Sequence, residues 1–183
     1  MGKQHPSYWA KENRACLVCG RIFRPHASNH GKGMGTACSR SCANMARGIK
    51  RDYEYISALP ESEKGYLAGL IDGEGCIHFD RKGNRVFLKI ANTDKKMIDW
   101  LRGRLGGGIT DRPGSGENAK HVYEWCVSTW AAIEILKKII NYLVCKKERA
   151  QIMIDFMAKR MTLTENEKDV IKKQMTVLNH RGV

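Results

Sequence analysis

The spacing of hydrophobic residues changes several times between residues 59 and 160, and these changes predict helices alternating with strands. Helical patterns with start and stop signals cover residues 59–73, 95–105, 131–141 and 143–160. Strand patterns cover residues 76–80, 85–91, 109–112 and 121–128. The pattern does not fix the break between the third and fourth helices, near Asn141. Each of the first two helices is thus followed by a pair of strands.

One of these strand patterns predicts which face of the sheet is buried. In residues 85–91 every even position is apolar, whereas Arg85 and Lys89 stand at odd positions. Successive side chains of a strand point to opposite faces, so one face should join the core and the other should be exposed and partly cationic. The run 121–128 does not divide in this way, because both of its alternating sets are largely apolar.

The two ends of the chain differ from this region. Residues 1–58 are basic, rich in cysteine and poor in apolar periodicity, and residues 161–183 predict one last helix with a short basic tail. Thr164 and Glu167 have the spacing of a capping box for that helix. Its apolar stripe would consist of Val170, Ile171, Met175 and Leu178. We expect two domains, 1–58 and 59–183.

Three glycines stand inside the first helix, where better helix formers would be expected. Gly65, Gly69 and Gly73 recur every four residues and therefore line one stripe. Each glycine in a helix interior costs about 1 kcal/mol relative to alanine, so the stripe indicates a compensating interaction. A second backbone packed very closely would provide it, because bulkier side chains would prevent such an approach.

The same helix ends in two acids, Asp72 and Glu74. The C-terminal end of a helix presents negative carbonyl ends and disfavours anions. Carboxylates gathered beside such carbonyls form an oxygen-rich pocket of the kind that Mg²⁺ or Ca²⁺ accepts. A buried helix with a glycine cap is the simpler alternative. That alternative would explain Gly73 or Gly75, but neither the stripe nor the acids.

The nine residues 67–75, LAGLIDGEG, resemble the LAGLIDADG signature of homing endonucleases. Seven of the nine letters match, the eighth remains an acid, and an apolar strand follows at once, as in that family. The resemblance covers residues 59–160 and implies an α+β fold of order α-β-β-α-β-β-α, with a four-stranded antiparallel saddle. The signature occurs once here, and in this family the helix packs on a counterpart, so the resemblance implies a homodimer.

The resemblance also implies a site-specific, Mg²⁺-dependent DNA endonuclease. Glu74 would be the catalytic acid that binds the metal, one in each subunit, and the Gly73 carbonyl would be a further ligand. Ca²⁺ would be a non-catalytic substitute. Asp72 would order the helix end. A divalent metal can activate water, neutralise charge at phosphorus and stabilise the leaving oxygen, and the dimer would cut both DNA strands across the minor groove.

Members of the family usually have two further polar residues in the site. Asn92 fits the position at the end of the second strand, and Lys146 fits a lysine near the start of the helix after the fourth strand. Lys147 is a near alternative. Such a lysine could steady the transition-state phosphate or polarise water. A solvated surface charge is the other interpretation of either lysine, and the sequence leaves the choice open.

The resemblance places the exposed face of the saddle along the DNA major groove. Arginine and lysine can pair with guanine, and asparagine with adenine, although roughly half or more of protein–DNA hydrogen bonds reach only the backbone. The candidate contacts are Arg81, Lys82, Asn84, Arg85, Lys89, Arg112, Asn118 and Lys120.

Composition agrees with a nucleic-acid partner. The 183 residues include 32 lysines and arginines against 19 acids, giving a net charge of +13 and a pI near 9.6. This excess is the electrostatic footprint of a polyanion binder. A basic membrane-surface protein is the competing interpretation. It is disfavoured because no run approaches the ~20 apolar residues of a membrane span and no basic amphipathic helix with aromatic residues stands out.

The expected location is inside the cell, in the cytoplasm or nucleoid or in an organelle. The first residues lack the apolar core of a signal peptide. Seven cysteines without a secretion signal favour metal or free thiols over disulfides. Members of the family are typically encoded in introns or inteins. An initial methionine and the lack of evident splicing ends favour the intron.

Four N-terminal cysteines have the spacing of a zinc site. Cys16 and Cys19 form one pair, and Cys38 and Cys42 form the other, so four thiolates could surround one tetrahedral ion. The first pair resembles a zinc knuckle and the second the start of a treble-clef helix. Four unrelated free thiols are the alternative. Other candidate ligands nearby are His26 and His30.

The remaining features of the N-terminal module and the other thiols have simpler interpretations. The basic residues of the module would extend the DNA footprint. They are Arg14, Arg21, Arg24, Lys32, Arg40, Arg47, Lys50 and Arg51. Cys76, Cys126 and Cys145 stand in apolar runs and are expected to be buried and inert.

Two other functions are compatible with the sequence. One is a non-catalytic nucleic-acid binder, because relatives include intron maturases that bind RNA and transcription regulators that keep the fold without cutting. Intron RNA is thus a further candidate partner. The other is an adaptor in which the zinc module does the work and the core only dimerises. Glu74 favours cleavage, since a binder needs no acid at that position.

Overall fold

The computed structural model describes residues 12–25, 35–40, 42–43, 46, 56, 58–82, 84–114 and 120–179. Contacts divide the chain into two compact units, Met1–Asp52 and Tyr53–Val183. The second unit thus begins before the boundary predicted after residue 58, and Ile56 is buried in its core. Within the described ranges, no helix is both long and apolar enough to cross a membrane.

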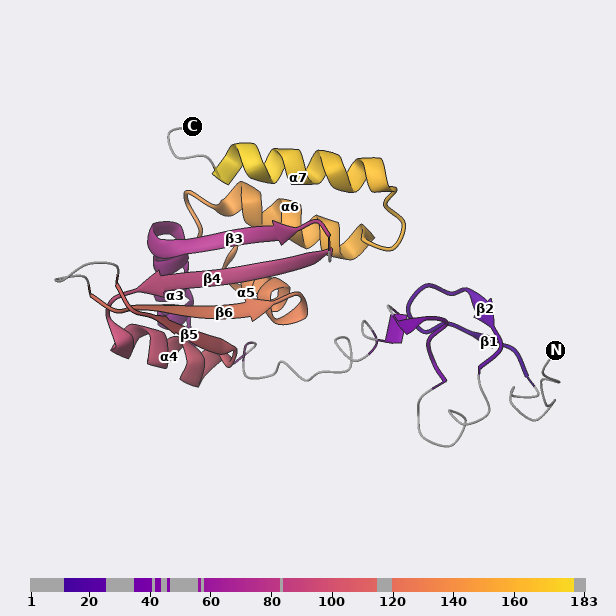
Figure 1. The fold of residues 1–183 in the computed structure, drawn as a ribbon, viewed down its shortest axis with the longest axis horizontal. Coiled ribbons are helices and arrows are strands. Elements are labelled where there is room, and N and C mark those ends of the chain that lie inside the picture. Colours follow the sequence, from indigo (N-terminus) through magenta and orange to yellow (C-terminus); the bar gives the residue numbers. More distant parts are fainter. Residues whose placement is uncertain are drawn as a thin grey trace. The chain divides into compact units, whose positions relative to one another are not determined.

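The described part of the second unit contains a four-stranded antiparallel sheet and five helices (Figure 1). Its elements are α3 (Glu61–Glu74), β3 (Gly75–Asp80), β4 (Arg85–Asn92), α4 (Lys95–Leu105), β5 (Gly108–Arg112), β6 (Val122–Ser128), α5 (Trp130–Ile139), α6 (Lys147–Lys159) and α7 (Glu165–Asn179). The strands lie in the order β3-β4-β6-β5, so the two hairpins meet at β4 and β6. The predicted α+β order α-β-β-α-β-β-α is confirmed, with two more helices after α5.

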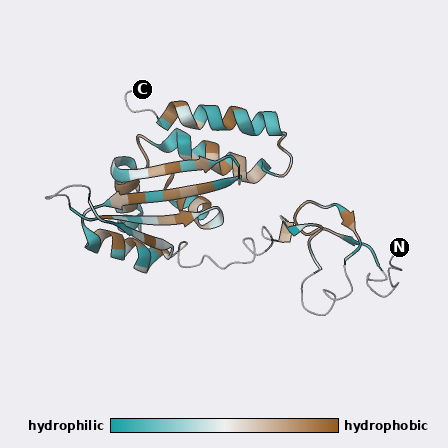
Figure 2. Ribbon diagram, viewed as in Figure 1, coloured by the Kyte–Doolittle hydropathy of each residue, from teal (hydrophilic) through white to brown (hydrophobic). Residues whose placement is uncertain are grey.

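The sheet has one buried face and one open face. In β4 the even positions are buried and the odd positions are not, which confirms the alternation in the sequence. In β6, Trp125 and Val127 are buried, whereas Glu124 and Cys126 are partly exposed. Helices α3, α4 and α5 contact the central strands and complete one hydrophobic core with them (Figure 2). Removing this apolar surface from water is the main stabilising term.

The turn from α3 into β3 depends on Gly75. A side chain there would place its Cβ only 2.7 Å from the Cα and the carbonyl oxygen of Ile71. The φ angle of −80° is open to any residue, so glycine is required for space and not for a left-handed cap. The turn is tight enough that Glu74, the last residue of α3, directly precedes the first strand.

The helix predicted over residues 143–160 begins later, at Lys147. Residues 140–142 form a turn after α5, and residues 143–146 link that turn to α6. The apolar letters of this link suggested a helix. However, the backbone N–H groups of Val144 and Lys146 bind a carboxylate of α3.

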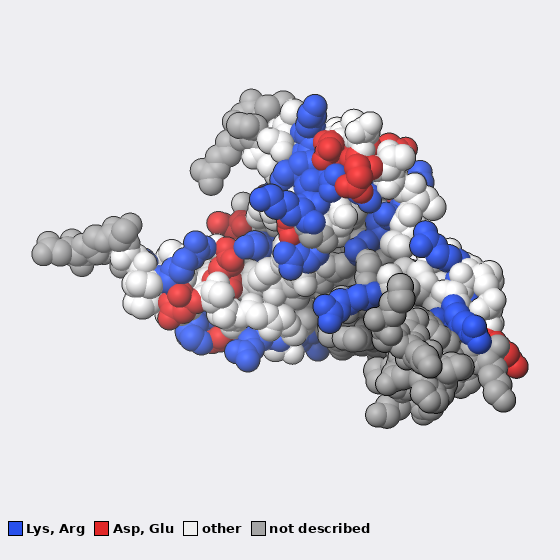
Figure 3. All heavy atoms as spheres, turned by 45° about the vertical axis from the view of Figure 1, so that its right-hand side comes forward, with Lys and Arg blue, Asp and Glu red and all other residues white. Residues whose placement is uncertain are grey.

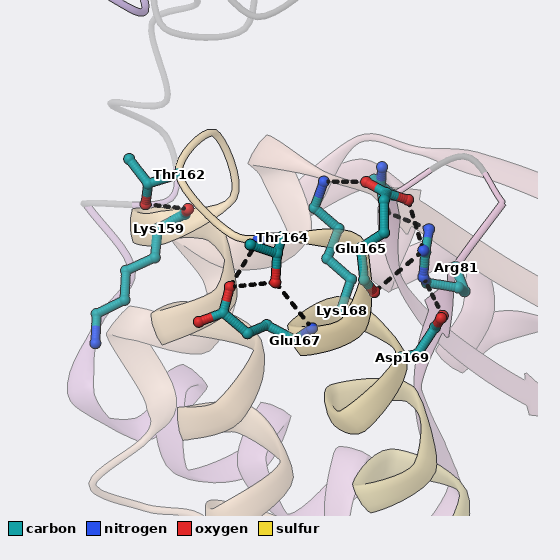
Figure 4. A network of polar contacts seen from close by, with 9 residues as sticks. Arg81, Lys159, Thr162, Thr164, Glu165, Glu167, Lys168 and Asp169 are labelled. Carbon is teal, nitrogen blue, oxygen red and sulfur yellow. Dashed lines mark hydrogen bonds and ion pairs between the residues drawn. The ribbon is translucent and has the colours of Figure 1, made fainter.

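The N-terminus of α7 is capped as predicted. Thr164 N donates to the Glu167 carboxylate at 2.7 Å, and Glu167 N donates to the Thr164 hydroxyl at 3.3 Å (Figure 4). Met175 is buried and Ile171 packs against the core. Val170, predicted to belong to the same apolar stripe, is 55% exposed. It is adjacent to Ile171 in the chain and therefore points about 100° away around the helix.

Helix α7 lies along the free edge of β3, beside α6 (Figure 1). Two of its side chains bind carbonyl oxygens of the edge strand. Lys172 Nζ donates to Phe79 O at 3.1 Å, and Asn179 Nδ2 donates to Ile77 O at 3.3 Å. The helix therefore covers backbone groups that an edge strand would otherwise offer to another chain.

The first unit contains a two-stranded antiparallel sheet of β1 (Arg14–Ala15) and β2 (Ile22–Phe23) (Figure 1). The turn between them closes with a 2.9 Å hydrogen bond from Gly20 N to Cys16 O. Gly20 has a φ of +71°, a region that favours glycine. Cys42 lies in a helical stretch further along the unit.

Candidate active site

The glycine stripe of α3 is exposed in the single chain. A Cβ added at Gly65, Gly69 or Gly73 would meet no described heavy atom within 4 Å. The opposite side of the helix carries Leu67 and Ile71, which are fully buried. The described part of the chain therefore does not provide the close backbone contact that the stripe predicts, and the bare surface is open to another molecule.

Asp72 ties the end of α3 to the start of α6. Its carboxylate accepts hydrogen bonds from Val144 N at 2.7 Å and from Lys146 N at 2.9 Å. These amides precede α6, where backbone N–H groups lack partners within the helix, and hydrogen bonds to an ionised acceptor are about twice as strong as neutral ones. These hydrogen bonds join the end of α3 to the residues that precede α6, and the ordering role of Asp72 stays a prediction.

The side chain of Lys146 binds the same end of α3. Its Nζ donates to Ile71 O at 2.8 Å and also to the carbonyl oxygen of Asp72. A cation at a helix C-terminus offsets the negative end of the dipole, which compensates for the acids there. Burial lowers the pKa of Lys146, and the positive charge of Arg149 adds to that effect. Lys147, the alternative candidate, is exposed.

Glu74 and Asn92 lie at one end of the sheet. Glu74 is exposed, and its carboxylate makes no hydrogen bond or ion pair within the described residues. Gly75 pairs with Ile90 across the β3–β4 ladder, so Asn92 lies only two residues, about 7 Å, beyond the position opposite Gly75. The Asn92 side-chain oxygen accepts a 2.8 Å hydrogen bond from Asp94 N, which leads into α4.

The oxygen atoms at this helix end fit a hard divalent cation. Mg²⁺ takes oxygen ligands and keeps several of its waters. The Glu74 carboxylate and the Gly73 carbonyl are ligands of that kind, and both residues are exposed. Each oxygen of the Asp72 carboxylate already accepts one backbone N–H, so this group has fewer lone pairs left for a metal ion than the Glu74 carboxylate has. Among the described residues, Glu74 therefore carries the carboxylate at this helix end that has no hydrogen-bond partner.

The open face of the sheet carries cations that are paired with acids. Lys89 of β4 and Arg112 of β5 both bind Glu124 of β6, each at 3.1 Å. At the turn end of the β3–β4 hairpin, Arg85 binds Asp80 at 2.7 Å. Figure 3 shows acidic side chains likewise scattered among lysines and arginines on the face that it presents. The sequence indicated the cations of the sheet but gave no role to Glu124.

Arg81, predicted to contact DNA, is bound by α7. Its Nε contacts Asp169 and its Nη2 contacts Glu165, both at 2.6 Å, and Lys168 binds the other oxygen of Glu165 at 2.8 Å (Figure 4). Only 22% of the Arg81 side chain is exposed. These ion pairs fasten the β3–β4 turn to α7, and a contact between Arg81 and DNA would require them to open.

Of the other predicted DNA contacts, those within the described residues lie next to the ends of strands. Lys82 is exposed in the β3–β4 turn. Asn84, in the same turn, has a φ of +48° and accepts a 3.5 Å hydrogen bond from Arg81. Lys120 is exposed just before β6. Asn118 lies outside the described residues.

The four N-terminal cysteines converge in the first unit, with all their sulfur atoms within 4.8 Å of one another. Cys38 Sγ is 3.5 Å from Cys19 Sγ and 3.7 Å from Cys42 Sγ, and the latter two sulfurs are 3.9 Å apart. Tetrahedral Zn–S bonds of 2.3 Å place sulfurs about 3.8 Å apart, so the cluster has the size that zinc requires. His26 and His30 lie outside the described residues.

The cysteines of this cluster differ in their tendency to ionise. Burial would raise the pKa of the Cys16 thiol, but hydrogen bonds from the backbone of Cys19, Cys38 and Val18 outweigh it and lower the pKa to about 6. The hydrogen bond with the Cys19 thiol, followed by burial, raises the pKa of Cys38 to about 12. A bound metal ion would remove this difference in ionisation, because each coordinated thiol is deprotonated.

The prediction that the three remaining cysteines are buried is wrong. Cys76 and Cys145 are exposed, and Cys126 is only partly buried. Cys76 and Cys126 flank Lys89 across the open face of the sheet, and Cys145 lies in the link before α6. An apolar run does not reveal which face of a strand is covered, and these two strand thiols stand on the uncovered one.

No protein-family model and no curated protein matches this chain, but solved structures do. The homing endonuclease I-CvuI, bound to the I-CreI target with Mg²⁺ and uncleaved DNA, shares 21% identity with a TM-score of 0.50, over 67% of this chain and 86% of that one. I-CvuI bound to its own target with Ca²⁺ shares 19% identity with a TM-score of 0.51, over 72% and 87%.

An archaeal intron-encoded homing endonuclease, I-Vdi141I, complexed with DNA, is also similar. It shares 19% identity with a TM-score of 0.51, over 67% of this chain and 87% of that one. At such identities the likeness is one of fold. The chain has the LAGLIDADG homing-endonuclease fold that the signature predicted, preceded by a cluster of four cysteines that could bind zinc.

Proposed function

We propose that this protein is a site-specific DNA endonuclease that works as a homodimer and uses Mg²⁺ to cut both strands of a long, near-palindromic site. One observation carries the proposal. The Glu74 carboxylate is exposed and unpaired among the described residues, while Asp72 and Lys146 hold the helix end that presents it. This arrangement leaves the Glu74 carboxylate available to a metal ion at a helix end that is held in place.

The exposed glycine stripe supports a homodimer. Gly65, Gly69 and Gly73 leave the backbone of α3 bare, so a second copy of α3 could cross it at close range. A two-fold interface brings the same residue of both copies together near the axis. Glu74 directly follows the stripe, so both carboxylates would lie near that axis and provide the second acid that one chain lacks.

The residues at the end of α3 would divide the chemistry among them. Glu74 and the Gly73 carbonyl would hold Mg²⁺, which when bound activates water and neutralises charge on the phosphate. Lys146 provides a positive charge beside the site for the charge that develops there. Asn92 would orient water at the end of β4. Asp72 would act through its contacts with α6, and Ca²⁺ would occupy the metal site without supporting cleavage.

The open sheet face and the net charge of +13 support double-stranded DNA as the substrate. I-CvuI and I-Vdi141I, which share the fold, were solved in complex with DNA.

A structural Zn²⁺ held by the four clustered cysteines would let the first unit fold without a large core. The basic residues of that unit would then extend the DNA footprint. With DNA as the substrate, the proposed activity would take place inside the cell. The proposed contacts are Lys82, Asn84, Arg85, Lys89, Arg112, Asn118 and Lys120, with Arg81 dependent on release from α7.

A cleavage screen tests the proposal. The purified protein is incubated with a randomised duplex DNA library, and the cut ends are sequenced. Double-strand ends within one long consensus are expected with Mg²⁺, and binding without cutting is expected with Ca²⁺. Sequence-specific binding without cutting in either metal would indicate a regulator. Tighter binding to structured RNA than to any duplex would indicate a maturase.

A further inference from the structure

An acid lies near the middle of the face that is proposed to contact DNA. Glu124 belongs to β6, a central strand, and stands opposite Ala91 of β4 and Thr110 of β5. Its side chain is only 20% exposed, less than either of the two cations that bind it. A carboxylate on such a face repels phosphates, so its presence needs an explanation.

The Glu124 carboxylate binds two cations whose backbones lie far apart. Lys89 stands level with Cys126, and Arg112 stands level with Val122, so their backbones are separated by roughly 13 Å along β6. Both nevertheless end on one carboxylate, Lys89 Nζ on Oε1 and Arg112 Nη2 on Oε2, each at 3.1 Å. The carboxylate offsets the repulsion between the two cations and fixes the direction of both side chains.

Stability alone does not account for this arrangement. Ion pairs at a protein surface contribute little to the free energy of unfolding, and 64% of the Arg112 side chain is exposed. Recognition provides a reason. Lysine and arginine donate to O6 and N7 of guanine, and a carboxylate can accept from N4 of cytosine. The three side chains thus present donors and an acceptor that complement a G·C pair.

We propose, on the basis of the proposed function, that Glu124 is a specificity-determining residue of the sheet. It directs Lys89 and Arg112 toward G·C base pairs in the major groove, and its negative charge weakens their binding to phosphate at other sequences. Specificity is a difference between affinities, and an element that disfavours the wrong partner can produce it.

Glu124→Gln is the test variant, because it removes the charge and keeps the shape. The matched control is Asp99→Asn. Asp99 binds Lys95 at 2.6 Å on α4, which packs on the opposite side of the sheet. Both changes remove one acid from one ion-paired group and raise the net charge by the same amount, so general electrostatic attraction should change equally.

Two measurements separate the variants. Affinity for random-sequence duplex is measured against salt, where each added phosphate contact steepens the log–log slope by about 0.9. Glu124→Gln should steepen it by about one to two contacts, and Asp99→Asn should not. Selection from a randomised library by binding in Ca²⁺ should show a G·C preference that falls by about tenfold in Glu124→Gln alone, with the other positions unchanged.

The outcomes distinguish this inference from the endonuclease proposal. Sequence selection without any cleavage in Mg²⁺ would overturn the endonuclease and leave the Glu124 inference standing. If the protein cleaves DNA but Glu124→Gln leaves the consensus and the salt slope unchanged, the Glu124 inference is overturned and the endonuclease proposal stands. If that variant folds poorly, Arg112→Gln replaces a largely exposed side chain on an edge strand. It should lose a guanine preference at one position, and an unchanged preference overturns the inference.

Discussion

Asp72 and Lys146 make two hydrogen bonds to each other, one in each direction. The Asp72 carboxylate accepts the backbone N–H of Lys146 at 2.9 Å, and the Lys146 ammonium donates to the backbone carbonyl of Asp72. The two residues are 74 positions apart in the chain, and their reciprocal contact fixes the end of α3 against the start of α6. Glu74, two residues after Asp72, is positioned by this contact.

Asp72→Asn should therefore lower stability at least as much as it lowers cleavage. An asparagine offers one acceptor and turns an NH₂ group toward an N–H, which leaves a backbone donor unsatisfied at a cost of about 1–3 kcal/mol. Urea unfolding measures the loss. Asp99→Asn, which removes a surface ion pair on α4, should change the free energy of unfolding by less than about 0.5 kcal/mol. An Asp72→Asn protein of unchanged stability but without activity would assign Asp72 to the chemistry instead.

Gly69→Leu should separate the proposed dimer without unfolding the chain. Gly69 and Gly103 both lie inside helices with open space beyond them. Leucine at either position raises helix propensity by up to about 1 kcal/mol, so Gly103→Leu on α4 is the matched control. We expect Gly69→Leu to sediment as a monomer at micromolar concentration and the control as a dimer. A tight, active Gly69→Leu dimer would exclude the stripe as the interface.

One zinc ion per chain is expected in protein purified without chelator, as measured by elemental analysis. Cys16→Ser removes one of the four converging thiols and should abolish stoichiometric zinc and weaken DNA affinity. Cleavage at saturating protein should survive. Cys145→Ser, at an exposed thiol outside the cluster, should keep the ion. Zinc-free wild-type protein, or zinc retained by Cys16→Ser, would contradict this assignment.

The attachment of α7 should depend on pH. Hydrogen bonds from Lys168 and Arg81 lower the pKa of Glu165, and hydrogen bonds from Thr164 lower the pKa of Glu167. A carboxyl group with a lowered pKa stabilises the folded state above its unfolded pKa, and this contribution is lost as the pH falls through the folded value. With an ordinary value of 4.5 for both groups, α7 should be firmly bound at neutral pH and loosen below that value.

Hydrogen exchange, corrected for the intrinsic effect of pH, measures this attachment. Between pH 6 and pH 3 the amides of α7 should lose more protection than those of α3. Glu165→Gln should reduce the protection of α7 at pH 6 and flatten its dependence on pH. Equal protection of both helices down to pH 3 would show that these ion pairs do not hold α7.

The sequence predicted those parts of the fold that depend on local pattern. Alternation in β4, the capping box of Thr164 and the order of helices and strands needed only neighbouring residues. The exposure of Cys76 was not predictable in this way, because it depends on which face of the sheet the helices cover. Similarly, the start of α6 at Lys147 depends on a carboxylate from α3.

In the candidate site, too, some residues could be predicted from the sequence and others could not. The signature drew attention to Glu74, and the resemblance to the family indicated Lys146, with Lys147 as a near alternative. Glu124 was missed, although a single acid in the otherwise apolar run 122–127 was a usable signal. Its role depends on cations of two other strands, which sequence spacing does not bring together. Arg81 was predicted to contact DNA, and the sequence did not reveal its acidic partners, because they belong to α7, more than 80 residues away.

Cleavage by Glu74→Gln at the wild-type target site is the most direct test of the central claim, namely that Glu74 at the end of α3 makes this fold a nuclease. Glu61→Gln is the matched control, since Glu61 begins the same helix and pairs only with Lys64 among the described residues. With Mg²⁺, we predict that Glu74→Gln makes no double-strand breaks while its DNA affinity stays within a few-fold, and that Glu61→Gln cuts normally. Cutting by Glu74→Gln at the wild-type rate, or a loss of binding as large as the loss of cutting, would contradict the claim.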